Sequence, residues 1–174
     1  MVRHADRRTD KELSMTEVHP NLYIGTIHEI GGIDYAQWRL VNVAKTYHLS
    51  LHRWSKPPIK THPCYVLCEE YPHLLSVNWV DGPAYYYDYA GKGVERIKKL
   101  LEFIHTNIPT YNILVTCDQA QSRGPSVALL YLAKYVHVIP NTTYADARYG
   151  FTRLYHRYQP SGIAEFLTAH WDEI

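Results

Sequence analysis

Apolar residues recur along the chain at two different spacings. Short apolar runs occupy 39–44 and 113–115, and runs of this length between polar residues are typical of buried strands. Over 89–108, apolar residues return every three or four positions, and charged residues fill the positions between them. That spacing predicts an amphipathic helix, which Pro109 is expected to end because proline cannot continue a helix. The chain therefore alternates strands with helices.

The same reasoning predicts the remaining elements and the fold class. The other expected elements are a turn and short strand at 18–25, strands at 64–69 and 74–80, one or two helical turns at 33–38, and helices at 126–135, 141–155 and 161–171. Residues 45–63 are read as a long connection. The alternation of strand and helix predicts an α/β fold, with a central, mostly parallel sheet of four to five strands flanked by helices.

Length and composition narrow the class of protein. A polar stretch without periodicity at 1–15 predicts a flexible leader, and 16–174 has the size of a single domain. The net charge of +1 offers no basis for binding nucleic acid or an acidic membrane surface. No apolar run reaches the roughly 18 residues that would suggest a membrane span. An odd number of cysteines, three, argues against a disulfide framework and favours a reducing, cytoplasmic location.

The strongest chemical signal is a polar loop between the run at 113–115 and the helix expected after Pro125. Cys117 lies at the start of this loop and Arg123 at its end. Backbone N–H groups and the macrodipole at a helix start favour an anion, and an arginine side chain can hold two oxygens of a phosphate-like group. The same surroundings would stabilise the Cys117 thiolate as a nucleophile. The alternative, a buried Cys117 that merely ends a core strand, leaves the polarity of the loop without a reason.

The Cys-x5-Arg spacing in this setting resembles the signature loop of cysteine-dependent protein phosphatases, most closely their dual-specificity branch. The resemblance extends from Val18 to the C-terminus and includes Leu-Tyr-Ile-Gly at 22–25. It implies a phosphocysteine intermediate on Cys117 and no cofactor or metal. The residues that it implies for binding the phosphoryl group are Asp118, Gln119, Ala120, Gln121, Ser122 and Arg123.

A second chemical element is the Asp-Gly-Pro sequence that follows the strand expected at 74–80. A strand of a parallel sheet would deliver Asp81 to the edge where α/β proteins place their sites. A leaving oxygen needs a proton donor, and the resemblance assigns that general acid to Asp81. Asp88 is the reserve candidate. The competing interpretation of Asp81 is an ordinary turn residue ahead of Gly-Pro.

The loop also departs from the family pattern His-Cys-x-x-Gly-x-x-Arg-Ser/Thr. Thr116, Ala120 and Gly124 replace the histidine, the glycine and the hydroxyl residue after the arginine. Ala120 is expected to keep a negative φ, since a left-handed conformation costs alanine roughly 1 kcal/mol or more. Asp118 brings a negative charge next to the nucleophile and would oppose thiolate formation. Ser122 and Ser126 could supply a hydroxyl, although neither lies at the matching position.

These observations leave three functions open. The first is a phosphatase acting on phosphotyrosine, and also on phosphoserine or phosphothreonine, in a protein or peptide. The second is a catalytically weak pseudophosphatase that binds phosphorylated partners, which the three loop changes favour. The third is sulfur transfer or arsenate reduction, which also uses cysteine loops. No lysine stands between Cys117 and Arg123, which disfavours a multiply phosphorylated lipid. The oligomeric state is left open.

Cys64 and Cys68 form the remaining motif, a Cys-x3-Cys pair. A zinc site would need further ligands, for which His62 and His73 are near in sequence. A redox role would have one of these thiols capture an oxidised Cys117 as a disulfide. Because the spacing matches no common zinc knuckle, the preferred interpretation is a pair of core residues.

Overall fold

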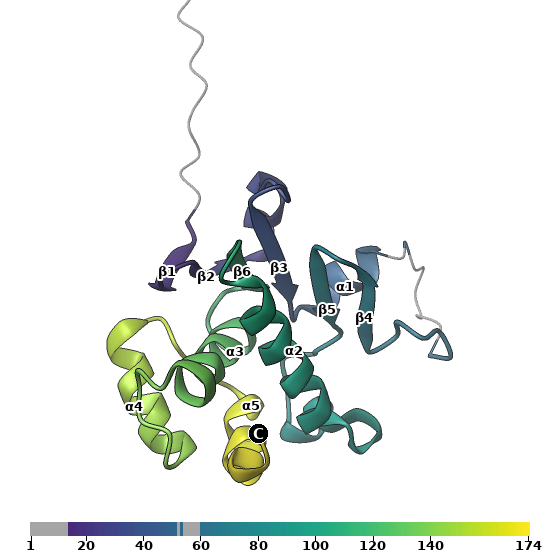
Figure 1. The fold of residues 1–174 in the computed structure, drawn as a ribbon. Coiled ribbons are helices and arrows are strands. Elements are labelled where there is room, and N and C mark those ends of the chain that lie inside the picture. Colours follow the sequence, from purple (N-terminus) through teal and green to yellow (C-terminus); the bar gives the residue numbers. More distant parts are fainter. Residues whose placement is uncertain (1–13, 52, 54–59) are drawn as a thin grey trace, which may run out of the picture.

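The computed structural model describes residues 14–51, 53 and 60–174. Within these residues, six strands form one mixed sheet in the order β1-β2-β6-β3-β5-β4 (Figure 1). The strands are β1 (Thr16–His19), β2 (Leu22–Thr26), β3 (Trp38–Asn42), β4 (Leu67–Tyr71), β5 (Leu74–Val77) and β6 (Asn112–Cys117). The expected leader lies outside the described residues except for its last two.

The centre of the sheet is parallel and its edges are antiparallel. β6 pairs in parallel with β2 and with β3, and β3 pairs in parallel with β5. β1 and β4 each pair antiparallel with a neighbour, as the outermost strands. The predicted α/β class is therefore confirmed, but the sheet has six strands rather than four to five. The prediction missed β1 because its residues, Thr-Glu-Val-His, lack an apolar alternation.

Helices cover both faces of this sheet. The α-helices of the described residues are α1 (Lys45–Leu51), α2 (Gly93–Asn107), α3 (Arg123–Tyr131), α4 (Tyr144–Leu154) and α5 (Gly162–His170). The larger core packs one face of the sheet against α2, α3, α4 and α5 (Figure 1). The smaller core lies on the other face, where α1 and the short helix Ile27–Gly32 contribute apolar side chains.

The α3 helix is enclosed on all sides. All nine of its residues are buried, as expected for a helix that neighbouring elements surround. It starts directly after the polar loop, and Pro125 lies in its first turn as predicted. Beyond α3 the chain continues through a wider helical turn, Leu132–Val136. The beginning of α3 is therefore held by its buried neighbours, close to the carboxyl end of β6.

Two sequence predictions are wrong in detail. Residues 33–38 were expected to be helical, but the helical turns lie earlier, at Ile27–Gly32, and 35–37 form a turn. A capping box explains the shift: Thr26 accepts from His28 N, and Glu29 Oε2 accepts from Thr26 N at 2.6 Å. The long connection expected over 45–63 begins with helix α1, whose length is only seven residues. Its middle portion lies outside the described residues.

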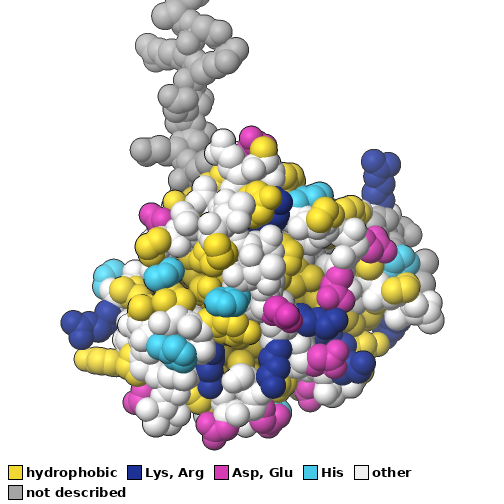
Figure 2. Space-filling model, viewed as in Figure 1, with side chains coloured by type: hydrophobic (Ala, Val, Ile, Leu, Met, Phe, Trp, Pro, Cys, Tyr) yellow, Lys and Arg dark blue, Asp and Glu magenta, His cyan; other side chains and the backbone are white. Residues whose placement is uncertain are grey.

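On the face that Figure 2 shows, no large patch consists only of positively charged or only of negatively charged side chains. Lysine and arginine side chains alternate there with aspartate and glutamate side chains, in keeping with the net charge of +1. Among the described residues, none of the helices combines the length and the apolar character needed to cross a membrane.

Leucine truncations test the position of the core. Leu100 on α2 is fully buried, whereas Leu154 at the end of α4 is 48% exposed. Leu100→Ala should lower the free energy of unfolding by about 2–5 kcal/mol, because it removes buried contacts and leaves a cavity. Leu154→Ala, the matched control, should change it by no more than about 0.5 kcal/mol. Urea unfolding followed by circular dichroism measures both, and equal losses would contradict the packing described.

Candidate active site

Cys117 ends the central strand of the sheet. β6 lies between β2 and β3, and Thr116 pairs with Gly25 on one side and with Asn42 on the other. Thr116 is fully buried and Cys117 is 2% exposed. The chain leaves the sheet directly after Cys117, and α3 begins at Arg123. The nucleophile predicted from the sequence therefore stands at the carboxyl end of a rigid strand and at the start of the loop.

The loop is held from outside by the segment that follows α4. Tyr155 Oη donates to the Ala120 carbonyl oxygen at 2.7 Å, and the backbone N–H of Gln159 donates to the Gln121 carbonyl oxygen at 2.8 Å. Arg157 Nη2 donates to the Gln119 carbonyl oxygen at 3.3 Å. In a trans peptide the N–H points opposite to the C=O. The amide N–H groups of residues 120–122 therefore face away from this segment, toward the inside of the loop.

Ala120 does not keep the negative φ expected for it. Its φ is +54°, in the left-handed region that costs an alanine roughly 1 kcal/mol or more. Ala120 is buried, and the bond from Tyr155 to its carbonyl oxygen supports this conformation. The family pattern places glycine here, and the conformation explains why: the loop keeps its shape in this chain at the expense of local strain.

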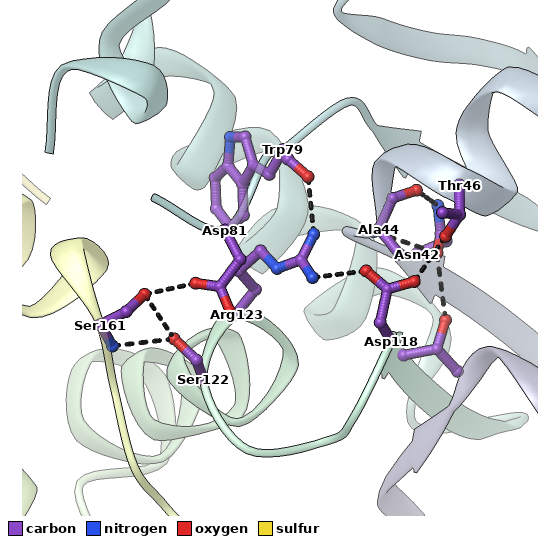
Figure 3. Close-up of polar contacts among 10 residues, drawn as sticks. Asn42, Ala44, Thr46, Trp79, Asp81, Asp118, Ser122, Arg123 and Ser161 are labelled. Carbon is purple, nitrogen blue, oxygen red and sulfur yellow. Dashed lines mark hydrogen bonds and ion pairs between the residues drawn. The ribbon is translucent and has the colours of Figure 1, made fainter. Parts of the chain in front are cut away.

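Arg123 occupies the floor of the site. Its residue exposure is 5%; Nη1 donates to the Trp79 carbonyl oxygen at 2.7 Å, and Nη2 donates to Asp118 Oδ2 at 2.5 Å (Figure 3). Nε is buried and has no hydrogen-bond partner among the described residues. A buried donor on a charged group is costly to leave unpaired. This part of the guanidinium is therefore prepared to donate to an oxygen of an anion.

Asp118 places a negative charge in the site, as expected from the sequence, and this charge forms an ion pair with Arg123. Its carboxylate pairs with Arg123 through Oδ2 and accepts from Thr46 Oγ1 at 2.5 Å through Oδ1. Burial alone would raise the pKa of Asp118, but the hydrogen bonds from Thr46 and Arg123 and the arginine charge hold that pKa below its usual value. The carboxylate is therefore ionised at neutral pH and occupies one arm of Arg123.

Asp81 reaches the same site from the loop after β5. It is exposed, and its Oδ1 accepts from Ser161 Oγ (Figure 3). Ser161 precedes α5, and its backbone N–H donates to Ser122 Oγ at 3.1 Å. A Cβ added to Gly162 would lie 2.1 Å from the Gly82 carbonyl oxygen. The loop that carries Asp81 is thus packed directly on the beginning of α5, which sets its distance from the polar loop.

Asp88, the reserve candidate for the general acid, lies elsewhere. Its Oδ1 accepts from the backbone N–H of Gly93 at 3.0 Å, at the start of α2. It lines a different cavity, together with Tyr85 and Phe166. A side chain bound in this way stabilises the helix start. The structure therefore does not bring Asp88 together with Cys117.

A cavity of about 240 Å³ unites the remaining predicted residues. Its lining consists of Asp81, Cys117, Asp118, Gln119, Gln121, Ser122, Arg123 and Gln159. Ala120, although part of the loop, is buried behind it. Gln159 is the lining residue that the sequence did not indicate. The resemblance extends to the C-terminus and so covers Gln159, but it does not single this residue out.

A buried polar chain lies behind the loop, where the family has its histidine. Thr116 Oγ1 donates to Asn42 Oδ1 at 3.4 Å, and Asn42 Nδ2 donates to Ser76 Oγ at 2.8 Å. Ser76 Oγ lies 2.8 Å from His48 Nδ1, and His48 Nε2 lies 2.7 Å from the Cys64 carbonyl oxygen. A carbonyl oxygen only accepts, so Nε2 carries the hydrogen and Nδ1 accepts from Ser76. This series of hydrogen bonds holds Thr116, and hence its neighbour Cys117, in place, and the side chain next to the thiol carries no charge.

The hydroxyl that the family places after its arginine has no direct substitute here. Ser122 Oγ accepts from Ser161 N, and Ser126 Oγ bonds to the Ser122 carbonyl oxygen and to Tyr158 Oη, both at 2.8 Å. Both hydroxyls are therefore engaged away from Cys117. A Cβ at Gly124 would lie 3.3 Å from Cys117 Sγ. A serine there would have room only if the thiol shifted slightly.

Comparison with known proteins supports the fold. No protein-family model matches the chain, and no curated protein matches its sequence. Among solved structures, a mouse putative dual specificity phosphatase complexed with zinc tungstate is similar over 92% of this chain and 87% of its own, with 16% identity and a TM-score of 0.60. The chain thus has the fold of the dual-specificity branch of the protein tyrosine phosphatase superfamily.

Two further structures show the same likeness. A leucine rich repeat and phosphatase domain containing protein from Entamoeba histolytica matches over 92% of both chains, with 14% identity and a TM-score of 0.59. The human tyrosine phosphatase-like serine/threonine/tyrosine-interacting protein matches over 91% of this chain and 96% of its own, with 14% identity and a TM-score of 0.59. At identities this low, structural similarity establishes the fold alone. The chemistry has to be argued from the residues of the site.

The pairing of Asp118 with Arg123 predicts a competition with bound anions. Asp118→Asn should raise the affinity for inorganic phosphate by roughly 3- to 30-fold, because it removes a like charge and loosens the hold on Nη2. Isothermal titration calorimetry measures this directly. Since the pKa of Asp118 is lowered, the difference should persist from about pH 5 to about pH 8.

Asp172→Asn is the matched control for the change in net charge. Asp172 is exposed and lies in the last helical turn of the chain, Trp171–Glu173. Its substitution should leave phosphate affinity within about twofold of wild type, as expected for a charge separated from the site by solvent. Unchanged or weaker phosphate binding by Asp118→Asn would show that the carboxylate positions Arg123 instead of competing for it.

Proposed function

We propose that this protein is a cysteine-dependent phosphomonoester hydrolase acting on phosphotyrosine, and on phosphoserine or phosphothreonine, in proteins or peptides. The observation that carries the proposal is the position of Arg123, which lines the same cavity as Cys117 and whose buried Nε has no partner among the described residues. A buried cationic donor beside a nucleophile is suited to hold an oxyanion while that nucleophile attacks it. The fold shared with dual-specificity phosphatases supports the same reaction.

The residues of the cavity suffice for both steps of such a reaction. Cys117 Sγ attacks phosphorus, the bond from phosphorus to the leaving oxygen breaks, and Asp81 gives its proton to that oxygen. The amides of the loop and Arg123 bind the other phosphoryl oxygens. Water then attacks the phosphocysteine, Asp81 takes the proton of the water, and the sulfur–phosphorus bond breaks to release phosphate. No metal or organic cofactor takes part.

The lining of the cavity favours a singly phosphorylated substrate. Gln119, Gln121 and Gln159 present neutral amides, while Asp81 and Asp118 are acidic. Such a lining would repel the additional phosphates of a highly charged head group. Gln119 and Gln121 are candidates for orienting the water of the second step, because amide groups can both donate to and accept from it.

A second function is favoured by the contact between Asp118 and Arg123. While the Asp118 carboxylate holds Nη2, this arm of Arg123 is not free to stabilise the transition state, so a phosphoryl group held by the loop amides would be bound without being hydrolysed. Gly124, which supplies no hydroxyl to steady the thiolate as it leaves the phosphocysteine, points the same way. One of the similar structures, the human tyrosine phosphatase-like serine/threonine/tyrosine-interacting protein, is named for an interaction.

The decisive experiment is the pH dependence of p-nitrophenyl phosphate hydrolysis. Wild type should give a bell-shaped profile, Cys117→Ser should have no activity, and Asp81→Asn should lose the alkaline limb because the general acid is gone. Asp88→Asn is the matched control, since this carboxylate caps α2, and it should retain the wild-type profile. Wild-type protein as inactive as Cys117→Ser, together with measurable phosphopeptide binding, would reject hydrolysis in favour of the second function.

The loop after β5 that carries Asp81, here called the acid loop, packs on the start of α5, and this packing gives an independent prediction. Gly162→Ala would place a Cβ 2.1 Å from the Gly82 carbonyl oxygen and so displace Asp81. We expect kcat to fall by roughly 10- to 100-fold, as for a misplaced catalytic group, with phosphate affinity nearly unchanged. Gly31→Ala is the control, because nothing lies within 4 Å of its added Cβ. Steady-state kinetics and phosphate titration separate the two effects; equal kcat in both variants would contradict the packing.

A further inference from the structure

Two cysteines and a glutamate meet on a part of the sheet that the proposed reaction does not use. Cys64 lies in the turn before β4, and Cys68 and Glu70 lie on β4, two residues apart. Their sulfur and carboxylate oxygen atoms all lie within 4.8 Å of one another. Cys64 and Cys68 are buried free thiols, while Glu70 is exposed. The cluster therefore combines two enclosed sulfur atoms with one oxygen open to solvent.

This grouping differs from the zinc site considered from the sequence. His62 Nδ1 accepts from the backbone N–H of Cys64 at 3.0 Å, so that nitrogen holds the turn. His73 packs against the ring of Tyr35, with centroids 4.3 Å apart. The third donor is instead Glu70, which sequence reasoning passed over. Glu70 follows Cys68 within the irregular part of β4, between Cys68 and Tyr71, and its carboxylate lies within 4.8 Å of both sulfur atoms.

The redox role considered from the sequence does not fit Cys68. Cys68 lies on β4 and Cys117 on β6, with β5 and β3 between them. Strands are about 4.8 Å apart, so these backbones are separated by roughly 14 Å. A disulfide needs Cα atoms within about 7 Å. Cys68 is therefore not placed to capture an oxidised Cys117.

We propose that Cys64, Cys68 and Glu70 bind one zinc ion, with water completing a tetrahedral site on the exposed side of Glu70. Two thiolates and a carboxylate form a donor set that suits zinc, which binds sulfur at about 2.3 Å. Tetrahedral geometry then needs the two sulfur atoms about 3.8 Å apart, so the donors have to approach one another by about 1 Å at most. Binding releases the two thiol protons to solvent and involves no oxidation.

The charge balance of the cluster supports a cation. Three acidic groups held this close disfavour one another's ionised forms. A divalent ion reverses that balance, because it stabilises the deprotonated ligands.

The surrounding hydrogen bonds hold the donors in place. The Cys64 backbone is fixed at both ends: its carbonyl oxygen by His48 and its N–H by His62. His48 also bonds to Ser76, the residue of β5 that pairs with Cys68. Support of this kind around metal ligands is worth about 10- to 100-fold in metal affinity. Zinc would join the turn before β4 to the edge of the sheet.

The test is a zinc titration of the full chain, purified with reductant and then freed of metal, in competition with a chromophoric chelator. We expect one zinc per chain, a dissociation constant raised roughly 100-fold or more by Cys68→Ser, and one raised roughly 10-fold by Glu70→Gln. Zinc should also raise the unfolding temperature of wild type by mass action. Glu70 is exposed, so Glu70→Gln keeps the test valid even where a cysteine variant fails to fold.

Two controls come from the chain itself. Glu69→Gln alters the neighbouring exposed glutamate, which pairs with Lys99 instead, and it should bind zinc like wild type. Cys117→Ser should also retain zinc, which keeps this result independent of the proposed catalysis. Zinc affinity that is equal in wild type, Cys68→Ser and Glu70→Gln, or that is lost on Cys117→Ser, would overturn the proposal. So would a Cys64–Cys68 disulfide in a protein whose reduced form binds no zinc.

Discussion

The ion pair between Arg123 and Asp118 is the contact through which most of the site is arranged. Arg123 is buried at the start of α3 and donates to Trp79 of the acid-loop segment and to Asp118 of the polar loop. It therefore joins three parts of the chain that carry the candidate chemistry. Its Nε stays without a partner among the described residues. A buried charge held incompletely by the protein is stabilised further by an external anion.

The segment that follows α4 completes this arrangement from the opposite side. Tyr155, Arg157 and Gln159 bind carbonyl oxygens of the loop, and Ser161 contacts both Asp81 and Ser122. The loop amides are thereby turned inward, and the strained Ala120 is kept in its left-handed conformation. Behind the loop, the buried chain from Thr116 to His48 takes the place of a charged histidine. Behind the loop, preorganisation therefore comes from packing and hydrogen bonds of uncharged side chains, and it adds to the ion pair of Arg123 with Asp118.

Local patterns predicted the elements and the two ends of the loop, because strand and helix periodicity and a helix start are short-range features. The fold class, α2, β6 and α3 were anticipated on those grounds. The contacts that distinguish this site were not. Ser161 and Gln159 lie about 40 residues beyond Cys117, and no spacing rule links them to it. Likewise, the positive φ of Ala120 follows from a bond to Tyr155 that only the folded chain creates.

The most direct test of Arg123 as the anion-binding group is the NMR signal of its Nε–H during titration with inorganic phosphate, assigned by its loss in Arg123→Lys. The account predicts a large downfield change of this resonance that saturates with phosphate, since Nε gains its missing acceptor. The change should remain in Cys117→Ser, where the nucleophile is absent. An Nε–H signal that stays unchanged while phosphate binds elsewhere would contradict the account.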